Sequence, residues 1–250
     1  MIIILEDAGY FNYYHWMVYM LSKLVECDII PEIIYAPLPD NDSFQQHSLK
    51  ILFPTSLIKN SIHDKTYLEY CQSEIFKLSK LKGIGNKGAV DKIYTNYLRL
   101  KLGFNAEKTE SHEYIYISRK LNNQSNSHYG IEARHIKNEE LMMKSLEPLG
   151  FKYVLLENMS LEKQMGLFKY AKIIISPHGA ALVNACFCMQ EAHVIEVTPT
   201  SHILEHFSSI CEQFNINYTR FTNVEDIDYY HNMLINIPEI VNLINKIVKL

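Results

Sequence analysis

The sequence predicts an α/β protein of two domains with a crevice between them, and two observations carry this prediction. Short apolar stretches alternate with helix-like stretches through the second half of the chain, and the expected strands are apolar on both faces. Such strands are typical of a parallel sheet that helices cover on both sides. The second observation is length, because 250 residues are enough for two domains of modest size.

The first half predicts two strands and three helices, from apolar runs and helical spacing. Pro31 stands near the start of the second strand, and Asp42 or Ser43 is the expected N-cap of the second helix. The segment 56–70 fits neither pattern clearly. In chain order we expect a strand at 1–5, a helix at 13–27, a strand at 28–38, a helix at 41–53 and a helix at 88–104.

The second half predicts five strands that alternate with helices, followed by an amphipathic helix at the end of the chain. A polar stretch at 105–113 separates the halves, so the predicted domains are 1–105 and 106–222, with a helical tail at 223–250. The expected strands are 114–119, 151–157, 172–176, 193–199 and 217–222. The expected helices lie within 132–150 and at 160–171, 180–189, 202–214 and 237–250.

Composition excludes several classes of protein. A hydrophobic fraction of 48% and a charged fraction of 21% are typical of a globular protein. The net charge of −4 argues against a partner such as DNA or RNA, whose many phosphates need cations. Five cysteines without a C-x-x-C pair predict neither a disulfide framework nor a zinc site, which fits a reducing compartment.

No targeting or membrane segment is expected. The apolar start of the chain is too short for a signal peptide and meets Glu6 and Asp7 at once. No uninterrupted apolar stretch approaches the roughly 18 residues that a membrane span needs. We therefore expect a soluble, cytoplasmic protein.

Two short motifs suggest chemistry that their surroundings do not favour. Residues 83–88 spell G-x-G-x-x-G, but a dinucleotide-binding loop needs a strand before it, and the preceding segment is helical or irregular. Residues 40–42 spell D-x-D, a metal-holding signature that needs an apolar strand before it, whereas Pro37 and Pro39 precede it here. A flexible loop before a helix explains the first motif better, and helix capping explains the second.

The histidines do not predict a metal site. His202 and His206 are four residues apart on an expected helix and could share a metal, although a solvent-facing pair explains them better. The other histidines in polar surroundings lack paired ligand spacing. We predict no metal and no other cofactor.

An ordered set of short elements resembles glycosyltransferase family 61, which includes protein O-linked N-acetylglucosaminyltransferases and plant xylan-decorating transferases. The resemblance covers most of the second half, from about residue 114 to 199, and one element of the first half that looks like the family's Asn-x-x-His. The elements, in order, are Asn12 to Trp16, Ile117-Ser118-Arg119, Arg134, Asn138, Glu139, Gln164, Ala171, His178-Gly179-Ala180, Asn184 and Glu196.

The resemblance implies a GT-B architecture of two Rossmann-like α/β domains. It further implies a nucleotide-sugar donor, with UDP favoured, bound mainly by the domain 106–222, and inversion at the anomeric carbon. The domain 1–105 would then face the acceptor, a glycan, glycoconjugate or protein hydroxyl. The chain is compact for this family, with a short first domain and no membrane anchor, so the resemblance leaves the acceptor open.

Two arginines are the candidates for holding the donor's diphosphate. Arg119 ends the first strand of its half, at the edge where open parallel sheets bind ligands. Its planar guanidinium suits bidentate phosphate contact, and a surface ion pair is the alternative. Arg134 precedes a helix and could contribute, or could pair with Glu139 or Glu140. Asn138 and Glu139 could equally cap that helix.

The turn after the apolar strand 172–176 is the second part of the predicted donor site. Gly179 lets the backbone turn tightly and approach a ligand, and the helix from Ala180 would present N–H groups and a positive dipole end to phosphate. His178 could donate to the leaving group or could be structural. Glu196 could accept from ribose hydroxyls or take part in local hydrogen bonds.

An inverting transfer needs a base for the acceptor hydroxyl, and a two-domain crevice would supply it from the first half. His15 is the leading candidate, because histidine titrates near neutral pH, although it could only cap or pack. Glu6 and Asp7 are the reserve candidates. The sequence therefore predicts an inverting, metal-independent glycosyltransferase. A catalytically inactive nucleotide- or glycan-binding module of the same fold is the alternative, and an NAD-dependent dehydrogenase on the glycine-rich loop is the least favoured.

Overall fold

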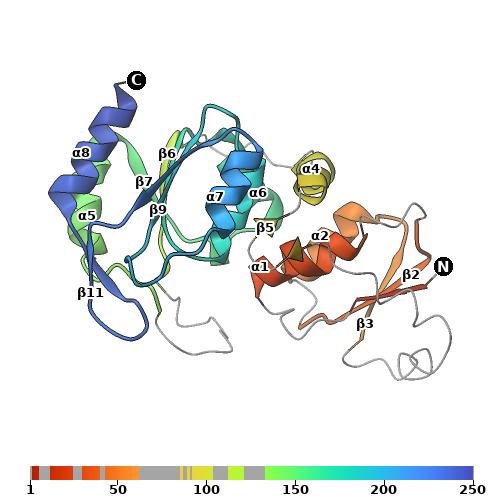
Figure 1. Cartoon of the computed structure of the whole chain (residues 1–250). Helices are drawn as coiled ribbons and strands as arrows, with labels where there is room; N and C mark the ends of the chain where they lie inside the picture. The colour runs from red at the N-terminus through yellow and green to blue at the C-terminus, as the bar shows by residue number, and fades with distance from the viewer. Residues whose placement is uncertain are drawn as a thin grey trace. The chain divides into compact units, whose positions relative to one another are not determined.

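The computed structural model in Figure 1 describes residues 2–5, 12–24, 30–39, 43–61, 85–86, 89–90, 92–103, 112–120 and 133–249. Contacts divide the chain into two compact units. The N-terminal unit is Met1–Ala106 with Ser160–Glu162, and the C-terminal unit is Glu107–Met159 with Lys163–Leu250.

The N-terminal unit contains a parallel sheet of three short strands. Its order is β1 (Ile2–Ile4), β2 (Ile33–Ala36) and β3 (Leu57–Asn60). Ile2 pairs with Ile33, and Ile33 pairs with Leu57. The third strand lies in the segment 56–70, which fitted neither pattern. Its residues are exposed or only partly buried, so they give no continuous apolar run that would have predicted a strand.

The expected helix at 13–27 is, where it is described, a series of three short helices of different type. They are α1 (Tyr13–His15), the π-helix η1 (Trp16–Met20) and the 3₁₀-helix η2 (Leu21–Leu24). Trp16 anchors this segment in the N-terminal unit: its side chain is fully buried, and its indole Nε1 donates to Ser48 Oγ at 2.8 Å. Ser48 lies on α2 (Phe44–Leu52), whose N-cap is Ser43, one of the two predicted capping residues.

The described part of the glycine-rich motif lies in a short antiparallel pair of strands. Its described residues form β4 (Gly85–Asn86), which pairs antiparallel with β5 (Ala89–Val90). Helix α4 (Lys92–Lys101) follows. A dinucleotide-binding loop requires a parallel strand that leads directly into a helix, so this local geometry argues against that use of the motif. The D-x-D motif lies outside the described residues.

The C-terminal unit is built on a five-stranded, fully parallel sheet, as the alternating pattern predicted. The strands are β6 (Tyr114–Ile117), β7 (Phe151–Val154), β8 (Ile173–Pro177), β9 (His193–Val197) and β10 (Asn217–Phe221). Their spatial order is β10-β9-β8-β6-β7. The chain therefore builds the sheet outward in both directions from the neighbouring pair β6 and β8.

Helices lie on both faces of this sheet. Figure 1 shows α5 (Glu139–Leu146) and α8 (Ile237–Val248) on one side, with α6 (Leu161–Tyr170) and α7 (His206–Gln213) on the other. Short 3₁₀ turns η5 (Glu147–Leu149) and η6 (Leu156–Asn158) flank β7, and the 3₁₀-helix η7 (Ala180–Phe187) follows β8. A hairpin of β11 (Val224–Asp226) and β12 (Met233–Ile235) follows β10.

Two features of the C-terminal unit differ from the sequence expectation. The tail is not a separate part, because α8 packs on α5 and buries Ile240 and Ile244 completely in the core of the sheet. Helix α7 begins at His206 rather than near 202, so His202 and His206 do not share a helix. Residues 200–205 instead form a loop that turns back over the end of β9.

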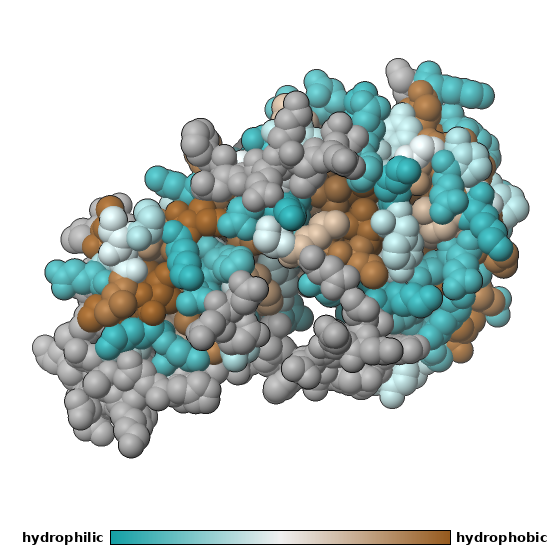
Figure 2. All heavy atoms as spheres, turned by 180° about the vertical axis from the view of Figure 1, so that it is seen from behind, coloured by the Kyte–Doolittle hydropathy of each residue, from teal (hydrophilic) through white to brown (hydrophobic). Residues whose placement is uncertain are grey.

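The surface of the C-terminal unit is mixed. In the view of Figure 2 it is mostly hydrophilic, with smaller hydrophobic areas between the polar ones. Of the helices described, none has both the length and the apolar character that crossing a membrane requires.

Candidate functional site

The candidate site lies at the carboxyl edge of the C-terminal sheet. Strand order reverses between β6 and β8, and open parallel sheets bind ligands outside the carboxyl ends of their strands at such a reversal. Arg119 comes two residues after β6, and His178 comes directly after β8. The structure therefore brings together, at one point of one edge, two elements that the sequence separates by more than fifty residues.

Arg119 lies directly against Gly179. A Cβ atom on residue 179 would stand 1.9 Å from the Arg119 Nη1 atom, so any side chain here would force the guanidinium to move. The backbone φ of Gly179 is 174°, which is extended and open to any residue. The backbone conformation therefore gives no reason for a glycine here. The missing Cβ matters because the Arg119 guanidinium occupies the space where a side chain would begin.

Hydrogen bonds fix the turn that carries Arg119. The guanidinium Nε donates to the carbonyl of Ala133 at 3.2 Å. Just before it, Ser118 Oγ donates to Glu139 Oε2 at 2.8 Å and accepts from the Lys120 N–H at 2.9 Å. Tyr116 OH donates to the same carboxylate oxygen at 2.9 Å. Glu139 thus ties the end of β6 to the start of α5, and Arg119 projects from a fixed backbone.

Asn138, the other predicted cap of α5, does not cap the helix and instead bonds to a neighbouring strand. Asn138 stands at the N-cap position, but its side chain makes no capping hydrogen bond. Its amide instead donates to the Ile235 carbonyl and accepts from the Ile235 N–H, each at 2.9 Å. This pair of bonds fastens the start of α5 to β12.

Arg134 reaches the same edge from the segment before α5. Its φ of 60° is in the left-handed region, which is uncommon for a residue with a side chain, and its N–H donates to the Tyr230 carbonyl at 3.0 Å. The guanidinium Nη1 lies 3.5 Å from His202 Nε2. Its Nε is buried and has no hydrogen-bond partner. A strained backbone with an unpartnered buried donor is typical of a site built to bind something.

The two guanidinium groups are cations without anions. Burial and, to a smaller extent, repulsion from Arg134 together lower the pKa of Arg119 to about 10, although the Glu157 charge acts in the opposite direction. Burial also lowers the pKa of Arg134. Within the part of the chain that the structure describes, neither arginine has a carboxylate at ion-pair distance. Both remain available to an anionic ligand.

His178 and Glu196 form a buried pair beside the arginines. His178 Nδ1 shares a hydrogen bond with Glu196 Oε1, and only 4% of the histidine surface is exposed. Glu196 is fully buried, and its Oε2 accepts from the hydroxyl of Tyr218. The Arg220 guanidinium Nε lies 3.8 Å from the same oxygen. Burial and the Glu196 charge together raise the pKa of Tyr218 well above its usual range.

This packing changes the interpretation of Glu196. Both carboxylate oxygens are already occupied by side chains of its own unit, and none of the residue is exposed. These contacts and the complete burial of Glu196 favour the alternative of local hydrogen bonding over contact with a ribose hydroxyl. The other nitrogen of His178, Nε2, has no hydrogen-bond partner within the described part of the chain and is the pair's one free polar atom.

Sequence reasoning missed a second group of side chains at this edge. The His202 ring stacks on the His231 ring, with centroids 4.6 Å apart, and meets the His178 ring edge-on at 4.9 Å. His231 Nδ1 lies 3.0 Å from Asp226 Oδ2. These residues come from two loops, after β9 and between β11 and β12, and no regular spacing in the sequence could have connected them. The contacts among the His178, His202 and His231 rings depend entirely on the fold.

The segment that begins at Ala180 is a 3₁₀-helix rather than the expected α-helix. Its first bond runs from the Leu182 N–H to the Gly179 carbonyl at 3.0 Å. Gln164 on α6 supports it, because its Oε1 accepts from the fully buried Asn184 at 3.4 Å. The same Gln164 amide donates to the Leu156 and Met159 carbonyls, each at 3.1 Å. Two residues of the family-like pattern are therefore structural supports of this turn.

The predicted base lies in the N-terminal unit. His15 is partly buried in the first turn of α1, where the side chain of Asn12 accepts from the N–H groups of Tyr14 at 2.9 Å and His15 at 3.4 Å. Asn12 is thus the helix cap that fixes the backbone of His15. The reserve candidates, Glu6 and Asp7, lie outside the described residues.

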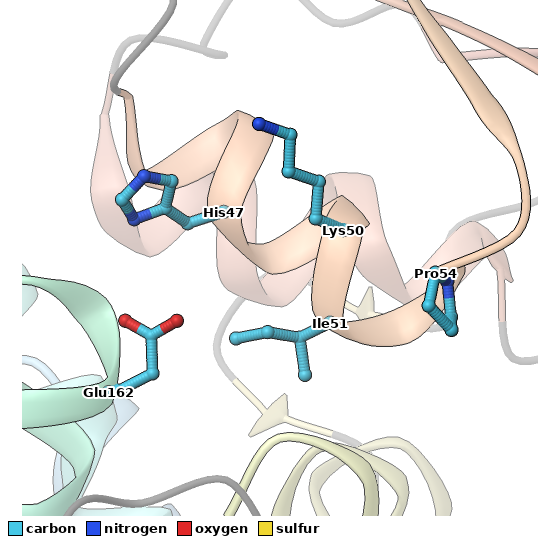
Figure 3. A pocket seen from close by; sticks show the side chains of 5 residues that line it. All are labelled: His47, Lys50, Ile51, Pro54 and Glu162. Carbon is cyan, nitrogen blue, oxygen red and sulfur yellow. The ribbon is translucent and has the colours of Figure 1, made fainter.

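Two further observations complete the site description. Side chains of His47, Lys50 and Ile51 project from α2, and Pro54 follows that helix (Figure 3); these include no predicted site residue. Among the residues that the structure describes, no three His, Cys, Asp or Glu side chains gather closely enough to hold a metal ion.

Comparison with known proteins identifies the class. The family model described as Glycosyltransferase 61 matches residues 13–195, which is well over half of the chain. The protein is thus a glycosyltransferase, an enzyme class that transfers a sugar from a donor to an acceptor. More narrowly, the chain belongs to glycosyltransferase family 61, as the ordered motifs indicated.

Other comparisons are weaker. Among solved structures the chain is similar to the dodecameric iron-containing heptosyltransferase TibC in complex with ADP-D-β-D-heptose. The identity is 9% and the TM-score 0.48, over 99% of this chain and 76% of that one. No curated protein matches the sequence significantly.

Proposed function

We propose that this glycosyltransferase uses a UDP-sugar and binds the donor's diphosphate at the carboxyl edge of the C-terminal sheet, between Arg119 and Arg134. One observation carries the proposal: two buried guanidinium groups lie at the reversal of strand order, and neither has a carboxylate partner within the described part of the chain. Burying an unpaired cation costs free energy. A diphosphate would supply the missing negative charge, and guanidinium groups suit its geometry.

His178 is the proposed donor of a hydrogen bond to the leaving diphosphate. Because Nδ1 is committed to Glu196, Nε2 is the nitrogen that remains for a phosphate oxygen. The buried Glu196 carboxylate would fix the ring orientation and place a negative charge beside the ring. Glu196 therefore acts through His178 in this proposal and does not contact the donor.

The proposed reaction inverts the anomeric carbon. A base removes the proton of the acceptor hydroxyl while its oxygen attacks the anomeric carbon. The bond from that carbon to the diphosphate breaks, and UDP leaves with the bonding electron pair. We assign the base to His15, which requires a GT-B arrangement in which the N-terminal unit faces the donor. The acceptor is a hydroxyl of a glycan, glycoconjugate or protein.

Two cations could stabilise the leaving UDP without a divalent ion. Arg119 and Arg134 would neutralise the charge that develops on the diphosphate, the task that a metal performs in other transferases. We therefore propose a metal-independent enzyme. A transfer assay with and without a chelator tests this point, and a chelator-sensitive rate would contradict it.

Donor binding is tested by thermal unfolding. UDP should raise the unfolding temperature of the wild type, because a ligand of the folded state stabilises it. Arg119→Ala should abolish this shift. Lys172→Ala is the matched control, since it removes a cation at the opposite edge of the same sheet and should leave the shift unchanged. The absence of a shift with any nucleotide in a panel would overturn the proposal.

Turnover is tested separately, by slow hydrolysis of a panel of UDP-sugars. The best UDP-sugar should be hydrolysed by the wild type, and His15→Ala should lose about 100-fold or more of that rate while still binding UDP. UDP binding without turnover of any donor would instead favour the non-catalytic module.

A further inference from the structure

His202 lies beside the proposed diphosphate site but outside the region that the family model matches. It belongs to the loop after β9, at the same carboxyl edge as Arg119 and His178. Its backbone is held by two hydrogen bonds, from its N–H to the Pro199 carbonyl at 3.0 Å and from Thr198 Oγ1 to its own carbonyl at 2.7 Å. The ring is held by stacking on His231. The imidazole is therefore fixed before any ligand arrives.

Every neighbouring element contributes charge to the surroundings of His202. Repelling groups outnumber attracting ones: Arg134 stands before α5, His178 after β8 and His231 in the β11–β12 loop. Glu196 on β9 acts in the opposite direction, and Asp226 on β11 is paired with His231. Burial is the largest influence, and together with the three repelling groups it lowers the pKa of His202 to about 4.

His202 is accordingly neutral in the empty site at ordinary pH. Its Nε2 lies 3.5 Å from Arg134 Nη1, and because an arginine can only donate, Nε2 is the acceptor of this contact. The histidine therefore occupies one donor of Arg134 with a neutral acceptor. A phosphate oxygen that binds Arg134 at this point must come close to His202 as well.

This inference rests on the proposed donor site: we propose that His202 joins Arg119, Arg134 and His178 as a diphosphate-binding group and takes up a proton as the diphosphate binds. The proton comes from solvent and bonds to Nε2. This nitrogen then changes from an acceptor of Arg134 into a donor to the phosphate, and Arg134 Nη1 is released to donate to the same ligand. Binding of the diphosphate thus adds one positive charge, on His202, to the site.

The physical reason is the change of charge in the site. An anion beside His202 stabilises the imidazolium and raises its pKa toward the ordinary value of 6.5. Between the lower value of the empty site and the higher value of the filled site, binding is coupled to proton uptake. Donor affinity should therefore rise as the pH falls through this window.

The test is isothermal titration calorimetry with UDP at about pH 5.5, in buffers of different ionisation enthalpy, which reports the number of protons taken up. His202→Gln keeps an oxygen that can accept from Arg134 but removes the titrating group. We expect the wild type to take up about one proton more than His202→Gln. The titration of UDP itself is common to both proteins and cancels in this difference.

His193→Gln is the matched control. His193 is also a partly buried histidine whose burial lowers its pKa, but it lies at the amino edge of the sheet and contacts Thr219 at 2.8 Å. It should bind UDP with the wild-type proton count. If His202→Gln binds UDP with the same proton count as the wild type, the inference about His202 is wrong and the donor site survives.

A second readout needs no variant. Nitrogen chemical shifts of the His202 ring should report a neutral ring in the free protein and a protonated ring with UDP at about pH 5.5. A ring that stays neutral in the saturated complex would overturn the proposal. If UDP does not bind, or binds Arg119→Ala as tightly as the wild type, the donor site itself fails, and the role of His202 fails with it.

Discussion

The amino and carboxyl edges of the C-terminal sheet differ in whether their cations are paired with carboxylates. At the amino edge, Lys172 Nζ pairs with Glu113 Oε1 at 2.8 Å, and both side chains are more than half exposed. At the carboxyl edge, Arg119 and Arg134 are partly buried, and no carboxylate of the described residues pairs with them. The same sheet therefore neutralises an exposed cation at one edge and leaves two partly buried cations unpaired at the other.

This contrast separates what the fold needs from what the function needs. A parallel sheet requires apolar strands and covering helices, and it is indifferent to the charges at its ends. An exposed pair such as Lys172 and Glu113 contributes little to stability. Unpaired buried cations lower stability, so their presence at the carboxyl edge is best explained by a ligand that supplies the opposite charge.

The largest effect is expected from Gly179→Ala. The new Cβ would displace the Arg119 guanidinium from its place, and loss of a charge-assisted contact should weaken UDP binding about 10- to 100-fold. Gly150→Ala is the control, because Gly150 has a φ of 92° and its substitution strains the backbone elsewhere in the unit. Calorimetry should show weaker UDP binding for Gly179→Ala only. Equal affinities in the two variants would remove Arg119 from the site.

A smaller effect is expected from Glu196→Gln. The amide oxygen can still accept from His178, but the negative charge beside the ring is lost. Hydrolysis of the selected UDP-sugar should slow about 10-fold, while the Kd for UDP changes little. Tyr218→Phe removes the other hydrogen bond and keeps the charge, so it should hydrolyse faster than Glu196→Gln. A wild-type rate in Glu196→Gln would show that His178 works without its carboxylate.

The smallest effect on binding is expected from Gln164→Ala. This change removes three hydrogen bonds that support η6 and η7, two of them to backbone carbonyls. The free energy of unfolding should fall by about 1–2 kcal/mol, whereas UDP affinity should change less than about twofold. Lys144→Ala, on the exposed side of α5, should alter neither quantity. Strong loss of UDP binding in folded Gln164→Ala would place Gln164 in the site itself.

The sequence predicted the parts of this site that follow from local pattern. The apolar runs of β6 and β8 are continuous because both faces are covered, and a parallel sheet places Arg119 and His178 at one edge. The contact between Arg119 and Gly179 could not be predicted, because side-chain packing across two strands leaves no local signal. The role of Glu196 was ambiguous for the same reason, since a strand-end carboxylate looks alike whether it faces a ligand or a histidine.

Loop residues were the least predictable. His202 looked like one of a helical pair with His206 until the start of α7 at His206 separated them. Its true partners, Arg134 and His231, are about seventy residues before it and about thirty after it. These three side chains come together only because the hairpin after β10 lies against the segment before α5. The hydrogen bond from the Arg134 N–H to the Tyr230 carbonyl joins these two segments.

The central claim is that Arg119 is kept for an anion at the expense of stability, and Arg119→Met tests it most directly. Methionine has a similar length and carries no charge, and replacing a buried ion by an apolar side chain is often neutral or stabilising by about 1–4 kcal/mol. Loss of the hydrogen bond to Ala133 offsets part of this gain. Thermal unfolding with and without UDP should show Arg119→Met at least as stable as the wild type without ligand, and unresponsive to UDP. A variant that is clearly less stable without ligand, or that UDP stabilises as much as the wild type, would contradict the account.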